Sequence, residues 1–232
     1  MTEQITHAFV LKKTVYKEAD YIISFYSSDF GKISCIARSA KKSSKRFGGR
    51  LEPFLNLKIK FKPGIRHIKY LEDCSIIKSY ADIMNDLDKY KWGSFILEYI
   101  ENLSEAEEPN RDLYELLHSS IEHICEKNDI INMIPRFQYK ALRCVGLTPE
   151  LTACFSCGRD VVDEGYLSIR QGGIACIECG KKLGAKVEGY KFIKKFDKND
   201  KQTIMKNIAL LTRFTKFHTG KEFKSERFVM EN

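Results

Sequence analysis

Hydrophobic and polar residues alternate with a period of two through much of the first eighty residues of the chain. In the segment 55–61 every second residue is apolar and the residues between are polar, which predicts a half-buried strand. Turn-forming sequences at 28–31, 48–49 and 63–64 separate runs of this kind. We predict five strands, at 8–13, 20–26, 32–37, 55–61 and 67–77. Five short strands favour a small closed barrel, most commonly an oligonucleotide-binding (OB) fold; an SH3-like barrel or a small sandwich is also compatible.

From residue 81 onward the apolar period becomes helical. We predict helices at 82–103, 111–127, 130–145 and 200–219. Asp82 is the expected cap of the first helix, and Gly146 ends the third. On these helices Leu87, Tyr90 and Phe217 fall at apolar spacing, so we expect them to be buried. The fold class that results is α+β: an N-terminal five-stranded OB-fold barrel followed by a helical domain.

The segment 36–54 carries six basic residues and a single acidic residue, Glu52. We call its central part, residues 38–50, the basic arm. Its basic residues are Arg38, Lys41, Lys42, Lys45, Arg46 and Arg50. Serines and glycines interrupt it, and no apolar period ties it to a core, so we expect a mobile loop. A concentrated cationic loop suits a phosphate backbone, although a solvated charge run is the alternative.

Charge is distributed unevenly along the chain. The net charge is +8 overall, made of +9 in residues 1–80, −7 in 81–153, −2 in 154–180 and +8 in 181–232. Two basic ends therefore flank an acidic middle, which localises any surface for a polyanion. Residues 105–108 carry three glutamates, which we interpret as a solvated run rather than a metal site.

Four of the eight cysteines form two closely spaced pairs, Cys154/Cys157 and Cys176/Cys179. Two C-x2-C pairs with eighteen residues between them match a tetrahedral structural zinc site. Free thiols and an iron–sulfur cluster are the alternatives. The glycine-rich sequence between the pairs indicates a β-hairpin, so we predict an inserted zinc ribbon-like segment with four cysteine ligands. Because all four ligands are cysteines, no coordination position is left for water, which makes the predicted Zn²⁺ structural.

The motifs of common enzyme classes are absent from the sequence. It contains no phosphate-binding loop, no dinucleotide fingerprint, no zinc-protease or deaminase signature and no nucleophile elbow. We therefore expect a protein that is not an enzyme. The start of the chain has no signal-peptide pattern and no apolar run approaches a membrane span, so we expect a cytoplasmic, nucleoid-associated protein without membrane contact.

Several short motifs, taken in order, resemble the RecO family of bacterial recombination mediators. They lie at 8–12, 16–20, 30–38, 49–54, 136–149 and 217–228, with the cysteine pairs directly after the fifth. The resemblance implies an OB domain at 1–80, a helical domain at 81–153 and 181–232, and a zinc segment at 154–180. It also implies a protein that binds single- and double-stranded DNA and anneals complementary strands. With RecR, such a protein promotes loading of RecA onto DNA coated by single-strand-binding protein, whose acidic C-terminal tail docks on the helical domain.

The residues suggest where these partners bind. The expected DNA-binding residues are Arg38, Lys41, Lys42, Lys45, Arg46, Phe47, Arg50, Lys58, Lys60 and Arg66, with Lys62 and Lys69 extending the surface. We expect Phe47 to be exposed and to stack on bases. A basic pocket for the acidic tail would contain Lys191, Lys194, Lys195 and Lys198. The rival functions are an RNA-binding or transcription-associated protein, a nuclease and a pure interaction scaffold.

Overall fold

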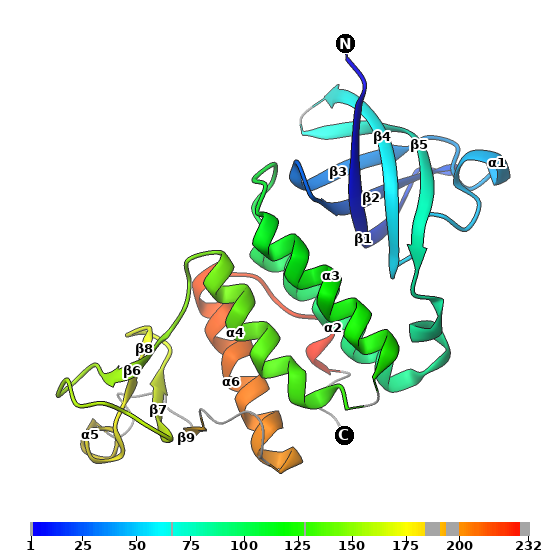
Figure 1. Cartoon of the computed structure of the whole chain (residues 1–232). Helices are drawn as coiled ribbons and strands as arrows, with labels where there is room; N and C mark the ends of the chain where they lie inside the picture. The colour runs from blue at the N-terminus through cyan, green and yellow to red at the C-terminus, as the bar shows by residue number, and fades with distance from the viewer. Residues whose placement is uncertain (1, 66, 128, 184–190, 194–199, 228–232) are drawn as a thin grey trace. The chain divides into compact units, whose positions relative to one another are not determined.

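The computed structural model describes residues 2–65, 67–127, 129–183, 191–193 and 200–227. The chain forms two compact units, an N-terminal unit of residues 1–128 and a C-terminal unit of residues 129–232 (Figure 1). Within the described residues, no helix is both long and apolar enough to cross a membrane.

Five strands of the N-terminal unit close into a barrel in the order β1-β2-β3-β5-β4 (Figure 1). The strands are β1 (Gln4–Tyr16), β2 (Asp20–Ser27), β3 (Gly31–Ala37), β4 (Leu55–Ile65) and β5 (Ile68–Ser79). Neighbours are antiparallel except for β3 and β5, which pair in parallel through three residue pairs. The predicted five-stranded barrel is confirmed. The apolar side of the alternation at 55–61 is confirmed as well, because Leu57, Ile59 and Phe61 are fully buried. Asn56 on the polar side is only 7% exposed, because it accepts a hydrogen bond from the buried Tyr114 hydroxyl.

The first helical region differs from the prediction. A 3-10 turn, η1 (Ala81–Asn85), precedes α2 (Leu87–Leu103), and the cap is Asp86, whose carboxylate accepts hydrogen bonds from the backbone N–H groups of Asp88 and Lys89. Leu87 and Tyr90 lie away from the buried face of α2, which passes through Trp92, Ile96 and Leu103. They are 69% and 44% exposed, so their predicted burial is wrong.

Helices α2 and α3 (Arg111–Glu126) pack together and contact the barrel. The ring of Phe9 on β1 lies 5.8 Å from that of Tyr114 on α3. The Ser24 hydroxyl on β2 donates to the Glu101 carboxylate on α2 at 2.6 Å. These contacts explain why the barrel and the first two long helices form one compact unit.

The C-terminal unit joins a helix pair to a small sheet. Its helices are η2 (Ile131–Met133), α4 (Ile134–Cys144), α5 (Ile177–Leu183) and α6 (Lys201–Thr219). Helices α4 and α6 pack on each other around the buried Gln138, whose side-chain amide donates to Thr212 Oγ1 at 2.9 Å. Gly146 has φ +74°, as expected after a helix end. Phe217 is 54% exposed, which corrects our expectation: the buried face of α6 passes through Phe214 and Thr215.

The sheet of the C-terminal unit has the strand order β6-β8-β7-β9. Its strands are β6 (Glu150–Cys154), β7 (Glu164–Ser168), β8 (Gly173–Ala175) and β9 (Lys191–Ile193). Strands β7 and β8 form the antiparallel hairpin expected between the cysteine pairs. Gly172, in the turn of this hairpin, has φ +65°, a conformation in which glycine carries no steric penalty.

Candidate nucleic-acid interface and metal centre

The basic arm packs into one end of the barrel. Three of its apolar side chains, Ala40, Phe47 and the adjoining Leu51, are 8%, 3% and 2% exposed and belong to the barrel core. A short helix, α1 (Ser44–Phe47), lies between Ala40 and Leu51, and the Ser43 hydroxyl accepts a hydrogen bond from the Arg46 N–H. The arm is therefore tied to the core, contrary to our expectation. Three apolar residues spaced over twelve positions match neither a strand nor a helix period, so the sequence pattern missed this anchor.

Phe47 does not have the exposure that we expected of it. Only 3% of the residue is accessible, because the ring packs among the inward-facing side chains of the barrel. A base cannot stack on a ring that the barrel core covers. The prediction that Phe47 is an exposed stacking residue is wrong, and its observed place is that of a core residue.

The cations of the arm point outward. Arg38, Lys41, Lys42, Lys45 and Arg46 are all exposed. Lys41 Nζ donates to the Lys17 carbonyl oxygen at 3.2 Å, and Arg46 Nη2 donates to that of Arg38 at 3.5 Å. Among the residues that the structure describes, none of these five side chains forms an ion pair with a carboxylate. Their charges are therefore available to an external anion.

Arg50 differs from the other cations of the arm. It is half-buried, and its Nη1 donates to the carbonyl oxygens of Lys45 at 3.0 Å and Arg46 at 3.2 Å, at the end of α1. The same atom lies 3.4 Å from the carbonyl oxygen of Cys74 on β5. A cation at this position satisfies helix-end carbonyls and links the arm to the barrel wall.

The cations of β4 and β5 are mostly paired with acids of the N-terminal unit. Lys60 pairs with Glu3 at 2.5 Å, and Lys62 pairs with Glu72 at 2.5 Å. The hydrogen bond from Lys62 to Glu72 raises the pKa of Lys62. Lys58 is exposed and forms no ion pair within the described part of the chain. Arg66 lies outside the described residues.

Two tyrosines, Tyr21 and Tyr70, lie beside cations of the N-terminal unit, and the sequence did not indicate these contacts. The Arg38 guanidinium lies 4.5 Å from the ring centroid of Tyr70, and Lys13 Nζ lies 4.6 Å from that of Tyr21. Both tyrosines are half-buried, and Tyr21 packs against the barrel core. Their proximity to cations depends on strand register, which a single sequence does not reveal.

The four cysteines of the quartet converge in the C-terminal unit. The sulfur atoms of Cys154, Cys157, Cys176 and Cys179 all lie within 4.8 Å of one another. A glycine follows each pair. Gly158 has φ +72°, and a Cβ on Gly180 would lie 2.1 Å from the ring of Tyr166. A larger residue would be strained at Gly158 and would clash at Gly180. Glycine at these two positions therefore allows the tight turn after each cysteine pair.

This arrangement fits a metal ion. Four sulfur ligands at this separation can surround a single tetrahedral centre and leave no position for water. The Arg159 guanidinium donates to Cys157 Sγ at 3.4 Å and lowers the pKa of that thiol to about 6, which favours the thiolate form that binds metals. Glu178 accepts a hydrogen bond from Arg159 at 2.5 Å and holds the guanidinium in place.

Four lysines form the expected site for an acidic tail. Lys194, Lys195 and Lys198 lie outside the described residues. Lys191 belongs to β9, which pairs with β7.

Comparison with known proteins covers nearly the whole chain. Residues 1–80 match the family model described as "Recombination protein O N terminal", and residues 84–227 match "Recombination protein O C terminal". A "DNA repair protein RecO" of Syntrophus aciditrophicus is 34% identical over 177 residues, covering 75% of this chain and 68% of the relative. Another, from Desulfatibacillum aliphaticivorans, is 29% identical over 249 residues, covering 97% and 96%. The barrel, the helical region and the cysteine quartet therefore lie in a chain that belongs to the RecO family.

Proposed function

We propose that the chain is a DNA-binding mediator of recombinational repair. In this role it binds single- and double-stranded DNA, anneals complementary strands and, with RecR, promotes RecA loading on DNA coated by single-strand-binding protein. The observation that carries the proposal is the basic arm: its apolar side chains fill the barrel while its cations face solvent. Membership of a family whose relatives are named for DNA repair supports it. We expect the protein to act in the cytoplasm, at the nucleoid.

The arm would bind the sugar-phosphate backbone rather than read bases. Lys41, Lys42, Lys45 and Arg46 present cations on one short segment whose backbone the core anchors. Little ordering of the arm is then needed when DNA binds, which favours affinity. Arg38 and Lys58 extend the surface, and the half-buried rings of Tyr21 and Tyr70 replace Phe47 as stacking candidates.

Annealing follows from the same charges. Two complementary strands repel each other through their phosphates, and a surface that neutralises both lowers that repulsion. It also raises the local concentration of one strand near the other. No covalent chemistry is required, which agrees with our expectation that the protein is not an enzyme.

The partner proteins are proposed from the family resemblance. The acidic tail of single-strand-binding protein would need a basic surface, and residues 181–232 carry a net charge of +8. We propose Lys191, Lys194, Lys195 and Lys198 for this contact.

We propose that the cysteine quartet holds one structural Zn²⁺. Zinc is the usual ion of closed four-cysteine sites with paired C-x2-C ligands. It would connect the end of β6 to the start of α5, and so fix a segment that buries little apolar surface.

A strand-annealing assay tests the proposed function. Complementary oligonucleotides, one carrying a fluorophore and the other a quencher, are mixed with the protein in the presence and absence of single-strand-binding protein. We expect faster annealing than without the protein under both conditions. Annealing no faster than the spontaneous reaction would refute the proposal, and Mg²⁺-dependent cleavage of the strands would point to a nuclease.

An RNA-binding role is the second candidate, because OB barrels with stacking tyrosines bind either nucleic acid. Affinities for DNA and RNA single strands of one sequence distinguish the two. The mediator role predicts that DNA binds at least as tightly as RNA. A strong preference for RNA would favour the alternative.

A further inference from the structure

The loop between α2 and α3 docks on the barrel beside the start of β3. Lys32 and Ala106 form a parallel β-bridge, and the Glu107 N–H donates to the Lys32 carbonyl oxygen at 2.9 Å. Gly31 allows the close approach, since a Cβ there would lie 2.0 Å from the Glu108 carbonyl oxygen. The loop is thus held on the barrel by contacts of its backbone, independently of the Glu107 side chain.

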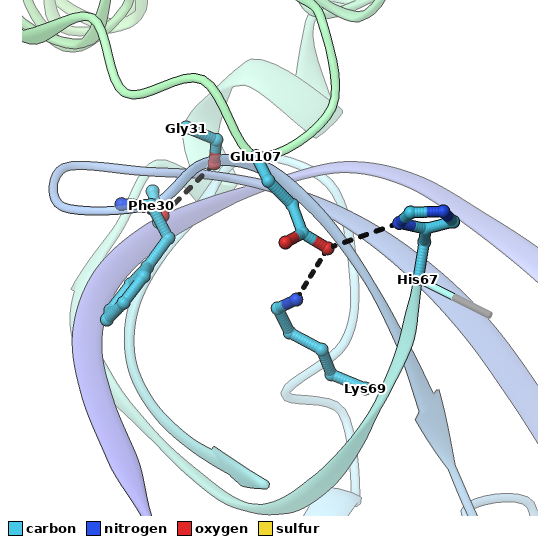
Figure 2. Close-up of polar contacts among 6 residues, drawn as sticks. Phe30, Gly31, His67, Lys69 and Glu107 are labelled. Atoms are coloured by element: carbon cyan, nitrogen blue, oxygen red, sulfur yellow. Dashed lines mark hydrogen bonds and ion pairs between the residues drawn. The ribbon is translucent and has the colours of Figure 1, made fainter. Parts of the chain in front are cut away.

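The Glu107 carboxylate lies between two cationic or potentially cationic groups of the barrel (Figure 2). Its Oε1 accepts from Lys69 Nζ at 2.7 Å and lies 3.9 Å from His67 Nδ1. The Lys69 side chain is 13% exposed, while those of Glu107 and His67 are 44% and 86% exposed. The acid thus covers Lys69 and is itself open to solvent.

The position of this site on the barrel suits a nucleic acid. Nucleic acids bind OB barrels along the β2–β3 face and at the loops between β1 and β2 and between β4 and β5. His67 follows β4, and Lys69 lies on β5 opposite Cys35 of β3. Tyr70, whose ring lies 4.5 Å from the Arg38 guanidinium, is the next residue on β5, so its side chain leaves the opposite face of the strand. The Lys69 site therefore lies on a different face of β5 from Arg38, next to the loop between β4 and β5, where OB barrels bind nucleic acid.

We propose that Lys69 and His67 form a subsite for a backbone phosphate, and that Glu107 occupies this subsite until a strand displaces it. The proposal rests on the proposed DNA-binding function. A carboxylate oxygen that accepts from an ammonium at 2.7 Å stands where an oxygen of a phosphodiester would stand. Because the Glu107 carboxylate is 44% exposed, a phosphate can approach from solvent and replace it without leaving the charge of Lys69 unpaired. Such an internal competitor weakens each strand contact and favours the exchange of strands that annealing requires.

The first test compares Glu107→Gln with Glu108→Gln. Both substitutions remove one negative charge from the same loop. Of the two glutamates, only Glu107 forms an ion pair with Lys69 in the described part of the chain. We expect Glu107→Gln to raise the affinity for single-stranded DNA about threefold, because a carboxylate no longer competes with the phosphate for Lys69. Glu108→Gln should change it much less. Equal effects of the two substitutions, or weaker binding by Glu107→Gln at an unchanged melting temperature, would overturn the proposal.

The second test removes the cation. Lys69→Gln should weaken binding and lower the slope of log affinity against log salt by about 0.7, the value for one phosphate contact on a single strand. In the double variant Glu107→Gln/Lys69→Gln the gain from Glu107→Gln should disappear. An unchanged slope for Lys69→Gln, or a gain that persists in the double variant, would refute the subsite. Absence of salt-dependent binding by the unsubstituted protein would instead refute the proposed DNA-binding function.

Discussion

Arg46 and Phe47 are adjacent in the chain, but the side chain of Arg46 is exposed to solvent and that of Phe47 is buried in the barrel core. The Phe47 ring is 3% exposed in the core, and the Arg46 guanidinium lies 4.9 Å from its centroid on the exposed side. This single step from core to solvent shows how the basic arm combines two roles. Its apolar residues pack into the barrel core, and its cations extend into solvent from a backbone that this packing holds in place.

Phe47→Ala should destabilise the N-terminal unit by about 3–5 kcal/mol, because it leaves a large cavity among barrel side chains. Chemical denaturation measures the effect. Leu87→Ala is a matched control in the same unit, because Leu87 is 69% exposed and its truncation should change stability by no more than about 0.5 kcal/mol. An equally small change for Phe47→Ala would contradict the assignment of Phe47 to the core.

Cys157→Ser should abolish binding of the proposed Zn²⁺ and destabilise the C-terminal unit. The free energy of binding a structural zinc is about 10–16 kcal/mol in small domains, so removal of the ion should unfold the segment around the quartet. Zinc content by elemental analysis and the melting temperature test this prediction. Cys125→Ser, outside the quartet, should retain about one zinc per chain. A metal-free Cys157→Ser protein with unchanged melting would show that the ion has no structural role.

Thr6→Val should reduce the part of the barrel's free energy of unfolding that is lost when Asp29 is protonated at low pH. Hydrogen bonds from Thr6 at 2.5 Å and Ser28 at 2.9 Å lower the pKa of Asp29. A carboxyl with a lowered pKa contributes stability above its ordinary pKa, and this contribution is lost as pH falls from the ordinary pKa through the lowered one. We expect Thr6→Val to cost roughly 1 kcal/mol at neutral pH and less once pH falls below the lowered pKa of Asp29. Thr14→Val, on the exposed part of β1, is the control, and a cost independent of pH would contradict the role of Asp29.

The barrel and the cysteine quartet were predictable because their signals are local. Alternation at 55–61 places side chains by strand geometry alone. The spacing of the two C-x2-C pairs identifies the four cysteines as candidate metal ligands. The helix that begins at Leu87 was placed too early because Asp82 and Asp86 are equally good caps in the sequence. Only tertiary packing chooses between them.

The surface was less predictable than the fold. The sequence identifies Lys69 and Glu107 as charged residues but does not show that they pair, because they are separated by 38 positions. The same holds for Lys60 and Glu3, and for the ring of Tyr70 beside Arg38. Phe47 was misplaced because its immediate neighbours are basic and polar, whereas its partners lie on distant strands.

The central claim is that the outward cations of the basic arm bind DNA phosphates. The most direct measurement is the salt dependence of affinity for single-stranded DNA, compared between the unsubstituted protein and the variant Lys41→Ala/Lys42→Ala/Lys45→Ala/Arg46→Ala. Melting temperature confirms that the variant retains its fold, since Ala40, Phe47 and Leu51 are kept. We predict weaker binding and a slope reduced by up to about 0.7 for each phosphate that the variant no longer neutralises. A folded variant with the same affinity and the same slope would contradict the account.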